Sequence, residues 1–100
     1  MNGEQWAIHL PHDRRLFVVI QHDLLDQSAH RVGIPLLPLA EHAGAVSRLM
    51  PVLDVEGVAY LARTDLTTTL RLKDLGPRIG SARDQREALV RAVDVLLGGV

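Results

Sequence analysis

The sequence predicts one mainly β domain whose strands are followed by a single C-terminal helix. Its 100 residues suffice for one compact domain with one core. Hydrophobic residues make up 47% of the chain and aromatic residues 3%, so the core must consist mainly of Leu, Val, Ile and Ala. The hydrophobic period is strand-like along most of the chain and helical at its end. We therefore expect about five to seven strands in a small twisted barrel or sheet with the helix packed on it.

Two strands are expected near the N-terminus. Trp6, Ile8 and Leu10 alternate with polar or small residues, which is the period-two pattern of a half-buried strand. Residues 16–21 are apolar at consecutive positions and rich in β-branched side chains. This second pattern indicates a strand that is covered on both faces.

A third strand is expected after a turn at residues 23–29. It covers residues 31–37 and ends near Pro38, because proline cannot donate a ladder hydrogen bond. Residues 39–49 remain ambiguous, since their apolar positions have helical spacing but Gly44 weakens a helix.

A β-hairpin is expected next. Residues 51–55 and 58–62 flank Glu56-Gly57, and glycine readily supplies the positive φ that a tight hairpin turn needs. Residues 64–72 are rich in β-branched side chains and are expected to continue the sheet.

The last part of the chain predicts a helix. The segment 81–84 (SARD) has the form of a capping box, and Gly98-Gly99 is typical of a helix stop. From residue 89 to the end of the chain, apolar residues recur at helical spacing and form one stripe, which consists of Leu89, Val93, Leu96, Leu97 and Val100.

Charge and composition exclude several classes of function. Eleven Lys and Arg against twelve Asp and Glu give a formal net charge of -1, which argues against a stand-alone nucleic-acid binder. The lack of cysteine rules out disulfides, a thiol nucleophile and Cys-ligated zinc. The first residues do not have the pattern of a signal peptide, and no apolar run approaches the length of a membrane span. We expect a soluble, cytoplasmic protein.

The residue types that support catalysis do not form a recognisable motif. The spacing of the histidines matches no metal-ligand set, so we expect no metal and no cofactor. No serine lies in a nucleophile elbow. The five histidines are His9, His12, His22, His30 and His42.

The order and spacing of several strings give a more specific result, because together they resemble the CcdB-type toxins of bacterial type II toxin–antitoxin modules. The matching strings are RLFVVIQ (15–21), DLLD (23–26), Arg31 with IPL (34–36), VSR (46–48) with Pro51-Val52, Gly57, Thr64-Asp65, Arg86 and AVDVLLGGV (92–100). The resemblance spans nearly the whole chain and is weakest over residues 1–13.

This resemblance implies an SH3-like antiparallel β-barrel with a small accessory sheet and one C-terminal α-helix, assembled as a homodimer. Toxins of this family are not enzymes. They bind the A subunit of DNA gyrase and trap its complex with cleaved DNA. A cognate antitoxin with a disordered segment neutralises the toxin, and contact with DNA is made only through the antitoxin.

The resemblance also transfers a gyrase-binding set by position: Leu24, Leu25, Asp94, Leu97, Gly98, Gly99 and Val100. From the residues alone, plain core packing is the alternative for Leu24 and Leu25, because leucine is usually buried. Gly98 stands where gyrase-poisoning members of the family carry a tryptophan. We therefore expect weak gyrase inhibition that improves on Gly98→Trp, unless Gly98 is a left-handed helix cap.

An antitoxin-binding set follows in the same way: His9, Pro11, Asp13, Arg14, His42, Thr64 and Asp65. Two other functions remain open. One is a homologue that binds an antitoxin peptide without inhibiting gyrase, and the other is a ribonuclease toxin on the same barrel, with arginines such as Arg15 and Arg31 supplying cations.

Overall fold

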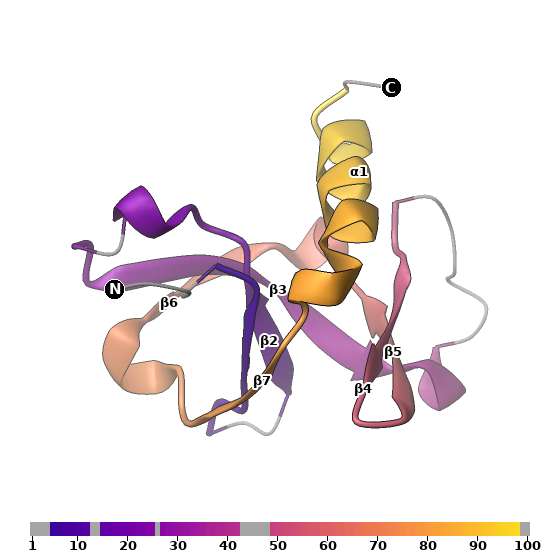
Figure 1. Cartoon of the computed structure of the whole chain (residues 1–100), viewed down its shortest axis with the longest axis horizontal. Helices are drawn as coiled ribbons and strands as arrows, with labels where there is room; N and C mark the ends of the chain where they lie inside the picture. Colours follow the sequence, from indigo (N-terminus) through magenta and orange to yellow (C-terminus); the bar gives the residue numbers. More distant parts are fainter. Residues whose placement is uncertain (1–4, 13–14, 26, 43–48, 99–100) are drawn as a thin grey trace.

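The structure is a computed structural model that describes residues 5–12, 15–25, 27–42 and 49–98. Within these residues the chain forms seven strands and one α-helix, joined by short 3-10 turns (Figure 1). The strands are β1 (Ala7–His9), β2 (Leu16–Val19), β3 (His30–Pro38), β4 (Val52–Val55), β5 (Val58–Ala62), β6 (Thr68–Arg71) and β7 (Arg78–Ser81), and the helix is α1 (Arg86–Leu96).

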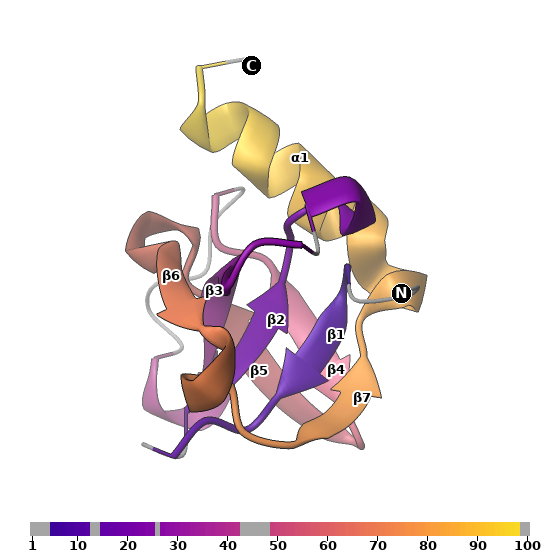
Figure 2. The same cartoon turned by 90° about the vertical axis from the view of Figure 1, so that its left-hand side faces the viewer.

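The strands join into one curled antiparallel sheet with the order β4-β5-β3-β2-β1-β7 (Figure 2). β3 is the longest strand. It pairs with β2 along one side, while on its other side the first residues pair with β6 and the last residues pair with β5. The mainly β fold with one C-terminal helix is confirmed, and the branch formed by β6 takes the place of the expected accessory sheet.

The main core lies between the concave side of the sheet and α1. The helix contributes Leu89 and Ala92, which are fully buried. As the composition requires, aliphatic side chains dominate this core, and Trp6 is the one aromatic residue among its buried members. The buried members are Trp6, Ile8, Leu16, Val18, Ile34, Leu36, Leu53, Val55, Ala62, Ala82 and Leu89.

The opposite side of the sheet carries a second, smaller cluster. Phe17 and Val19 of β2 pack there with Leu75, and the partly buried Leu70 of β6 lies against them. Gly33 of β3 makes room for the Phe17 ring, because a Cβ at this position would lie 2.5 Å from Phe17 Cζ and 2.3 Å from the Val18 carbonyl oxygen. Both sides of β2 are therefore buried, as its apolar run predicts.

The expectation of a half-buried first strand is wrong. All three residues of β1 are buried: Ile8 belongs to the main core on one face, and on the other face the His9 ring lies against the Gly76 carbonyl oxygen. β7 itself was not predicted, since its four residues follow a proline and include Gly80. β7 pairs with the free edge of β1, and the alternating sequence of β1 indicates neither this partner nor the cover over its second face.

The hairpin is confirmed. Glu56 and Gly57 form the two-residue turn between β4 and β5, with φ of 53° and 83°. The next segment differs from the prediction, since Thr64–Leu66 forms a 3-10 turn before β6 begins. Thr64 is fully buried there, and its hydroxyl donates a hydrogen bond to the Leu49 carbonyl oxygen.

The predicted capping box does not cap α1. A 3-10 turn, Arg83–Gln85, precedes the helix, and the Ser81 hydroxyl accepts a hydrogen bond from the Arg83 N–H of that turn at 3.1 Å. The side chain of Gln85 is bonded to both backbone groups of Asp54 at 2.8 Å, which fastens the helix start to β4.

The glycine stop at the end of α1 is confirmed. Gly98 has a φ of +82°, and its N–H donates to the Val95 carbonyl oxygen at 3.0 Å. The apolar stripe is buried only in its first part: Leu89 is fully buried, whereas Leu96 is 40% exposed and Leu97 is 77% exposed. The second half of α1 extends past the sheet, as both views show (Figures 1 and 2).

Candidate partner-binding surfaces

Leu24 and Leu25 lie in the 3-10 turn Asp23–Leu25, which we call the leucine turn. Their exposed fractions are 83% and 58%, so the core-packing alternative is wrong for both residues. The turn is nevertheless held by hydrogen bonds: the Gln5 N–H donates to Asp23 Oδ1 at 2.7 Å, and Gln21 Nε2 donates to the Leu25 carbonyl oxygen at 3.1 Å. The fold therefore presents two leucines to solvent on a supported backbone.

The end of α1 carries the other members of the gyrase-binding set. Asp94 is exposed on the helix, and Leu97 follows its last turn. Gly99 and Val100 lie outside the described residues. Gly98 has the left-handed φ of a helix cap, and this backbone conformation disfavours any side chain. A Cβ added at Gly98 would nevertheless meet no atom within 4 Å. Gly98 therefore meets the exception stated with the Gly98→Trp prediction, since it is a left-handed cap that a tryptophan would strain.

The structure places the leucine turn and the end of α1 at the same end of the molecule but does not merge them. Both views show the two segments at the upper end, and Figure 1 separates them across the width of the sheet. One chain thus presents two apolar patches rather than one continuous surface.

The antitoxin-binding set is dispersed over the fold. His9 is buried in β1, with its Nδ1 3.0 Å from the Gly76 carbonyl oxygen, and Thr64 is buried beside Leu49. His42 is half-buried after the 3-10 turn Leu39–Glu41. Asp13 and Arg14 lie outside the described residues.

Among the described members of this set Asp65 is the exposed one, whereas Pro11 is buried, and Asp65 forms an ion pair with Arg63. Its carboxylate accepts hydrogen bonds from Arg63 Nε at 2.8 Å and from Arg63 Nη2 at 2.7 Å. This bidentate pairing, chiefly through the hydrogen bonds, lowers the pKa of Asp65 and raises that of Arg63.

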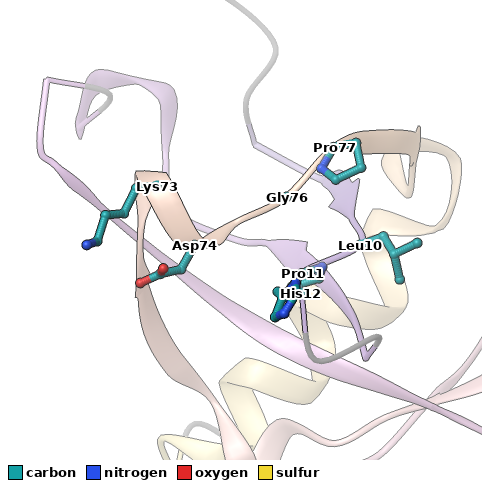
Figure 3. Close-up of a pocket in the computed structure, with 7 residues that line it drawn as sticks. All are labelled: Leu10, Pro11, His12, Lys73, Asp74, Gly76 and Pro77. Atoms are coloured by element: carbon teal, nitrogen blue, oxygen red, sulfur yellow. The ribbon is translucent and has the colours of Figure 1, made fainter.

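Of the grooves that border the connection after β1, two contain Pro11. The larger, of about 770 Å³, has Leu10, Pro11 and His12 on one side and Lys73 and Asp74 on the other (Figure 3). It is completed by Gly76 and Pro77. The close approach of its walls depends on Gly76, because a Cβ there would lie 2.1 Å from the Leu10 carbonyl oxygen.

The smaller groove, of about 280 Å³, lies over the Phe17 cluster, and we call it the Phe17 groove. It brings Pro11 together with the segment that directly follows Asp65 in the chain. Leu66 and Leu70 of this groove are absent from the residues predicted above. Leu66 ends the 3-10 turn and Leu70 lies in β6, so no single sequence period indicates that they line one groove. The lining residues are Pro11, Arg15, Leu16, Phe17, Pro35, Leu66, Thr68 and Leu70.

The described residues contain no group of three or more His, Asp or Glu side chains placed to hold a metal ion. In the same part of the chain, no helix has the length and apolar character needed to cross a membrane.

Comparison with protein families gives a match that covers nearly the whole chain. The family model described as CcdB protein matches residues 6–99. The chain belongs to the CcdB family. Members of this family are toxins of toxin–antitoxin systems with an activity directed at DNA gyrase. A search among curated proteins found no match to the chain.

Proposed function

We propose that this CcdB-family protein is a toxin that binds the A subunit of DNA gyrase through the leucine turn and the end of α1. It acts by binding rather than by catalysis. The observation that carries the proposal is exposure: Leu24, Leu97 and Leu25 have the highest exposed fractions among the large hydrophobic residues of the described chain, at 83%, 77% and 58%. These are three of the residues whose positions match the gyrase-binding set of the family.

The physical basis is the cost of leaving such side chains in water. Burying one leucine contributes roughly 1.5–3 kcal/mol, and desolvated apolar anchors often dominate the binding free energy of an interface. Because the leucine turn is held by hydrogen bonds from Gln5 and Gln21, little ordering is required when a partner covers it.

A homodimer fits the separation of the two patches. Leu96 is 40% exposed on the part of α1 that extends past the sheet, and symmetric pairing of this helix face with a second copy removes apolar surface from water while Leu97 stays available to gyrase. Pairing at this end also brings all four patches to the same end of the dimer, because the leucine turn and the end of α1 lie at the same end of one chain. Sedimentation at micromolar concentration is expected to give twice the chain mass, and a mass of 11.0 kDa would contradict the dimer.

The gyrase proposal is tested by gyrase-dependent cleavage of supercoiled DNA. The double variant Leu24→Ser/Leu25→Ser is expected to need at least about thirtyfold more protein for the same cleavage, because two interface anchors are lost. Val58→Ser is the matched control, since Val58 is 50% exposed in β5 and belongs to neither patch. Equal activity of the double variant and the control would contradict the proposal.

A second candidate function is a homologue that binds its antitoxin without poisoning gyrase. It is favoured by Gly98, which stands where poisoning relatives carry a tryptophan. The positive φ of Gly98 also disfavours a side chain at this position. The unmodified protein separates the two candidates: cleavage with gyrase supports the toxin, and antitoxin binding without cleavage supports the second candidate. An RNA-cleavage assay run beside it tests the ribonuclease alternative.

Neutralisation by a cognate antitoxin completes the proposal. The antitoxin wraps the toxin with a segment that orders on binding, and it supplies any contact with DNA. Gyrase acts in the cytoplasm, so the proposed target places the protein there.

A further inference from the structure

A third groove, of about 450 Å³, lies between the start of β3 and the 3-10 turn Leu72–Asp74 that follows β6. We call it the cationic groove. None of the described residues that line it is acidic, and two of them, an arginine and a lysine, carry a permanent positive charge. The lining residues are Ala29, His30, Arg71, Leu72 and Lys73.

The strand register brings these side chains together. His30 of β3 pairs directly with Arg71 of β6, so both side chains lie on one face of the sheet. The Leu72 N–H donates to the Ala29 carbonyl oxygen at 2.9 Å, which holds the turn after β6 against the start of β3. The groove is therefore a fixed part of the sheet.

The two cations of the groove retain hydrogen-bond donors for a partner. Arg71 Nε donates to Asp74 Oδ2 at 3.1 Å, and this bond orients the guanidinium group. Within the described chain, the Nη groups of Arg71 and the Nζ of Lys73 make no hydrogen bond or ion pair. Leu72, which lies between the two cations in the chain, is 45% exposed.

The cationic groove continues the surface of the leucine turn. Gln21 Nε2 donates to the Leu25 carbonyl oxygen at 3.1 Å and to the His30 carbonyl oxygen at 3.3 Å, so one buried amide ties the leucine turn to the first residue of β3. Figures 1 and 2 show the leucine turn and the turn after β6 on the same side of the molecule, with the start of β3 between them. A protein that covers Leu25 can therefore extend over the groove.

We propose that the cationic groove is a further contact for the A subunit of gyrase and that it takes an acidic segment of that subunit. One apolar side chain of the segment covers Leu72, and its carboxylates bind Arg71 and Lys73, because a guanidinium fork and an ammonium group both donate to carboxylate oxygens. This inference rests on the proposed function, since it extends the surface that binds gyrase.

Two other occupants fit the groove less well. The phosphate backbone of DNA would satisfy the cations, but it offers no apolar group to cover Leu72, and the net charge of -1 disfavours binding of the whole chain to DNA. A second copy that pairs symmetrically about this groove would set cations against cations. An acidic segment with an apolar side chain satisfies both kinds of group.

The charge of the groove is tested by calorimetric titration of the full-length protein with the purified A subunit of gyrase, without DNA, at low and at high salt. Lys73→Glu is expected to weaken binding at low salt at least about tenfold and to lessen its salt dependence, because a carboxylate then faces the acidic segment.

The matched control for this change is Arg83→Glu, which alters the net charge by the same amount. Arg83 is exposed in the 3-10 turn before α1, and its side chain has no hydrogen bond or ion pair within the described residues. The control is expected to bind within about twofold of the unmodified protein, because its charge lies outside the groove.

The apolar contact is tested in the same titration. Leu72→Asp is expected to weaken binding at least about tenfold, because an apolar contact is lost and a carboxylate is added beside the acidic segment. Its control is Val58→Asp, since Val58 is 50% exposed in β5 and lies in neither the groove nor the leucine turn. Circular dichroism before titration checks that each variant is folded.

The outcomes separate this inference from the proposed function. If the A subunit binds the unmodified protein and Leu24→Ser/Leu25→Ser weakens that binding, while Lys73→Glu and Leu72→Asp bind as tightly as their controls, the groove assignment is wrong and the proposed function stands. If the A subunit does not bind the unmodified protein, both fall.

Two further results would overturn the groove assignment alone. If Lys73→Glu weakens binding only when DNA is added to the A subunit, the groove holds a phosphate backbone. If either groove variant changes the sedimenting mass of the protein alone, the groove holds a second copy of the chain.

Discussion

Gly33→Ala is expected to destabilise the protein severely. The added Cβ would lie 2.3 Å from the Val18 carbonyl oxygen and 2.5 Å from Phe17 Cζ, whereas a carbon and an oxygen normally approach to about 3.3 Å. The oxygen belongs to the backbone of β2, so the strands themselves must separate by roughly 1 Å to relieve the contact. Overpacking of this kind costs typically 1–3 kcal/mol, and a backbone obstacle favours the upper end.

A loss of about 3 kcal/mol lowers the Tm of a domain of this size by roughly 12–24 °C. The measurement is urea and thermal unfolding followed by circular dichroism at one fixed protein concentration, because a dimer makes stability concentration-dependent. The matched control is Gly80→Ala in β7, where a Cβ meets nothing within 4 Å. This control is expected to keep or gain stability, by up to about 1 kcal/mol, since alanine restricts the unfolded chain.

Two results would refute this reasoning. One is a Gly33→Ala variant whose unfolding free energy stays within about 0.5 kcal/mol of the parent. The other is an equal loss in Gly33→Ala and Gly80→Ala, which would show that strand glycines matter here for a reason other than the space above β3.

Two further predictions concern the partner surfaces. Gly98→Trp is expected to lower the unfolding free energy by about 1 kcal/mol, because the φ of +82° at this position strains a side chain. Gyrase-dependent cleavage by this variant is expected to be no stronger than that by the parent, and a clear gain in cleavage would contradict the cap assignment. For Asp65, the lowered pKa means that the ion pair with Arg63 stabilises the fold above the unfolded carboxyl value of about 3.9 and that this contribution is lost as the pH falls further. Asp65→Asn is expected to remove the corresponding small part of the acid dependence in urea unfolding between pH 6 and pH 2, and an unchanged profile would contradict it.

Local signals in the sequence predict local structure well here. Glu56-Gly57 indicates the hairpin because two residues between apolar runs leave few other solutions, and Gly98 indicates the end of α1 for a similar reason. β7 escapes prediction because it is a strand mainly through its pairing with β1, a partner about seventy residues earlier.

The candidate surfaces likewise depend on contacts between distant parts of the chain, which the sequence does not predict. Composition favours burial of Leu24 and Leu25, and only the family resemblance points to their exposure. The residues around these leucines do not indicate their exposure, because the turn that exposes them is held by hydrogen bonds from Gln5 and Gln21. The Phe17 groove could not be predicted from the sequence. Its walls meet through the register of β3, and register is a property of the folded sheet.

The position of β7 also constrains how the chain matures during synthesis. β1 is made first, yet one of its two edges remains without a partner until Ser81 has left the ribosome, and the core on its inner side waits for Leu89. An open edge and an uncovered apolar face are the features that recruit other chains. The nascent chain therefore exposes a binding surface in β1 that disappears on completion, so a factor that holds this strand would delay the appearance of active toxin without touching the finished molecule.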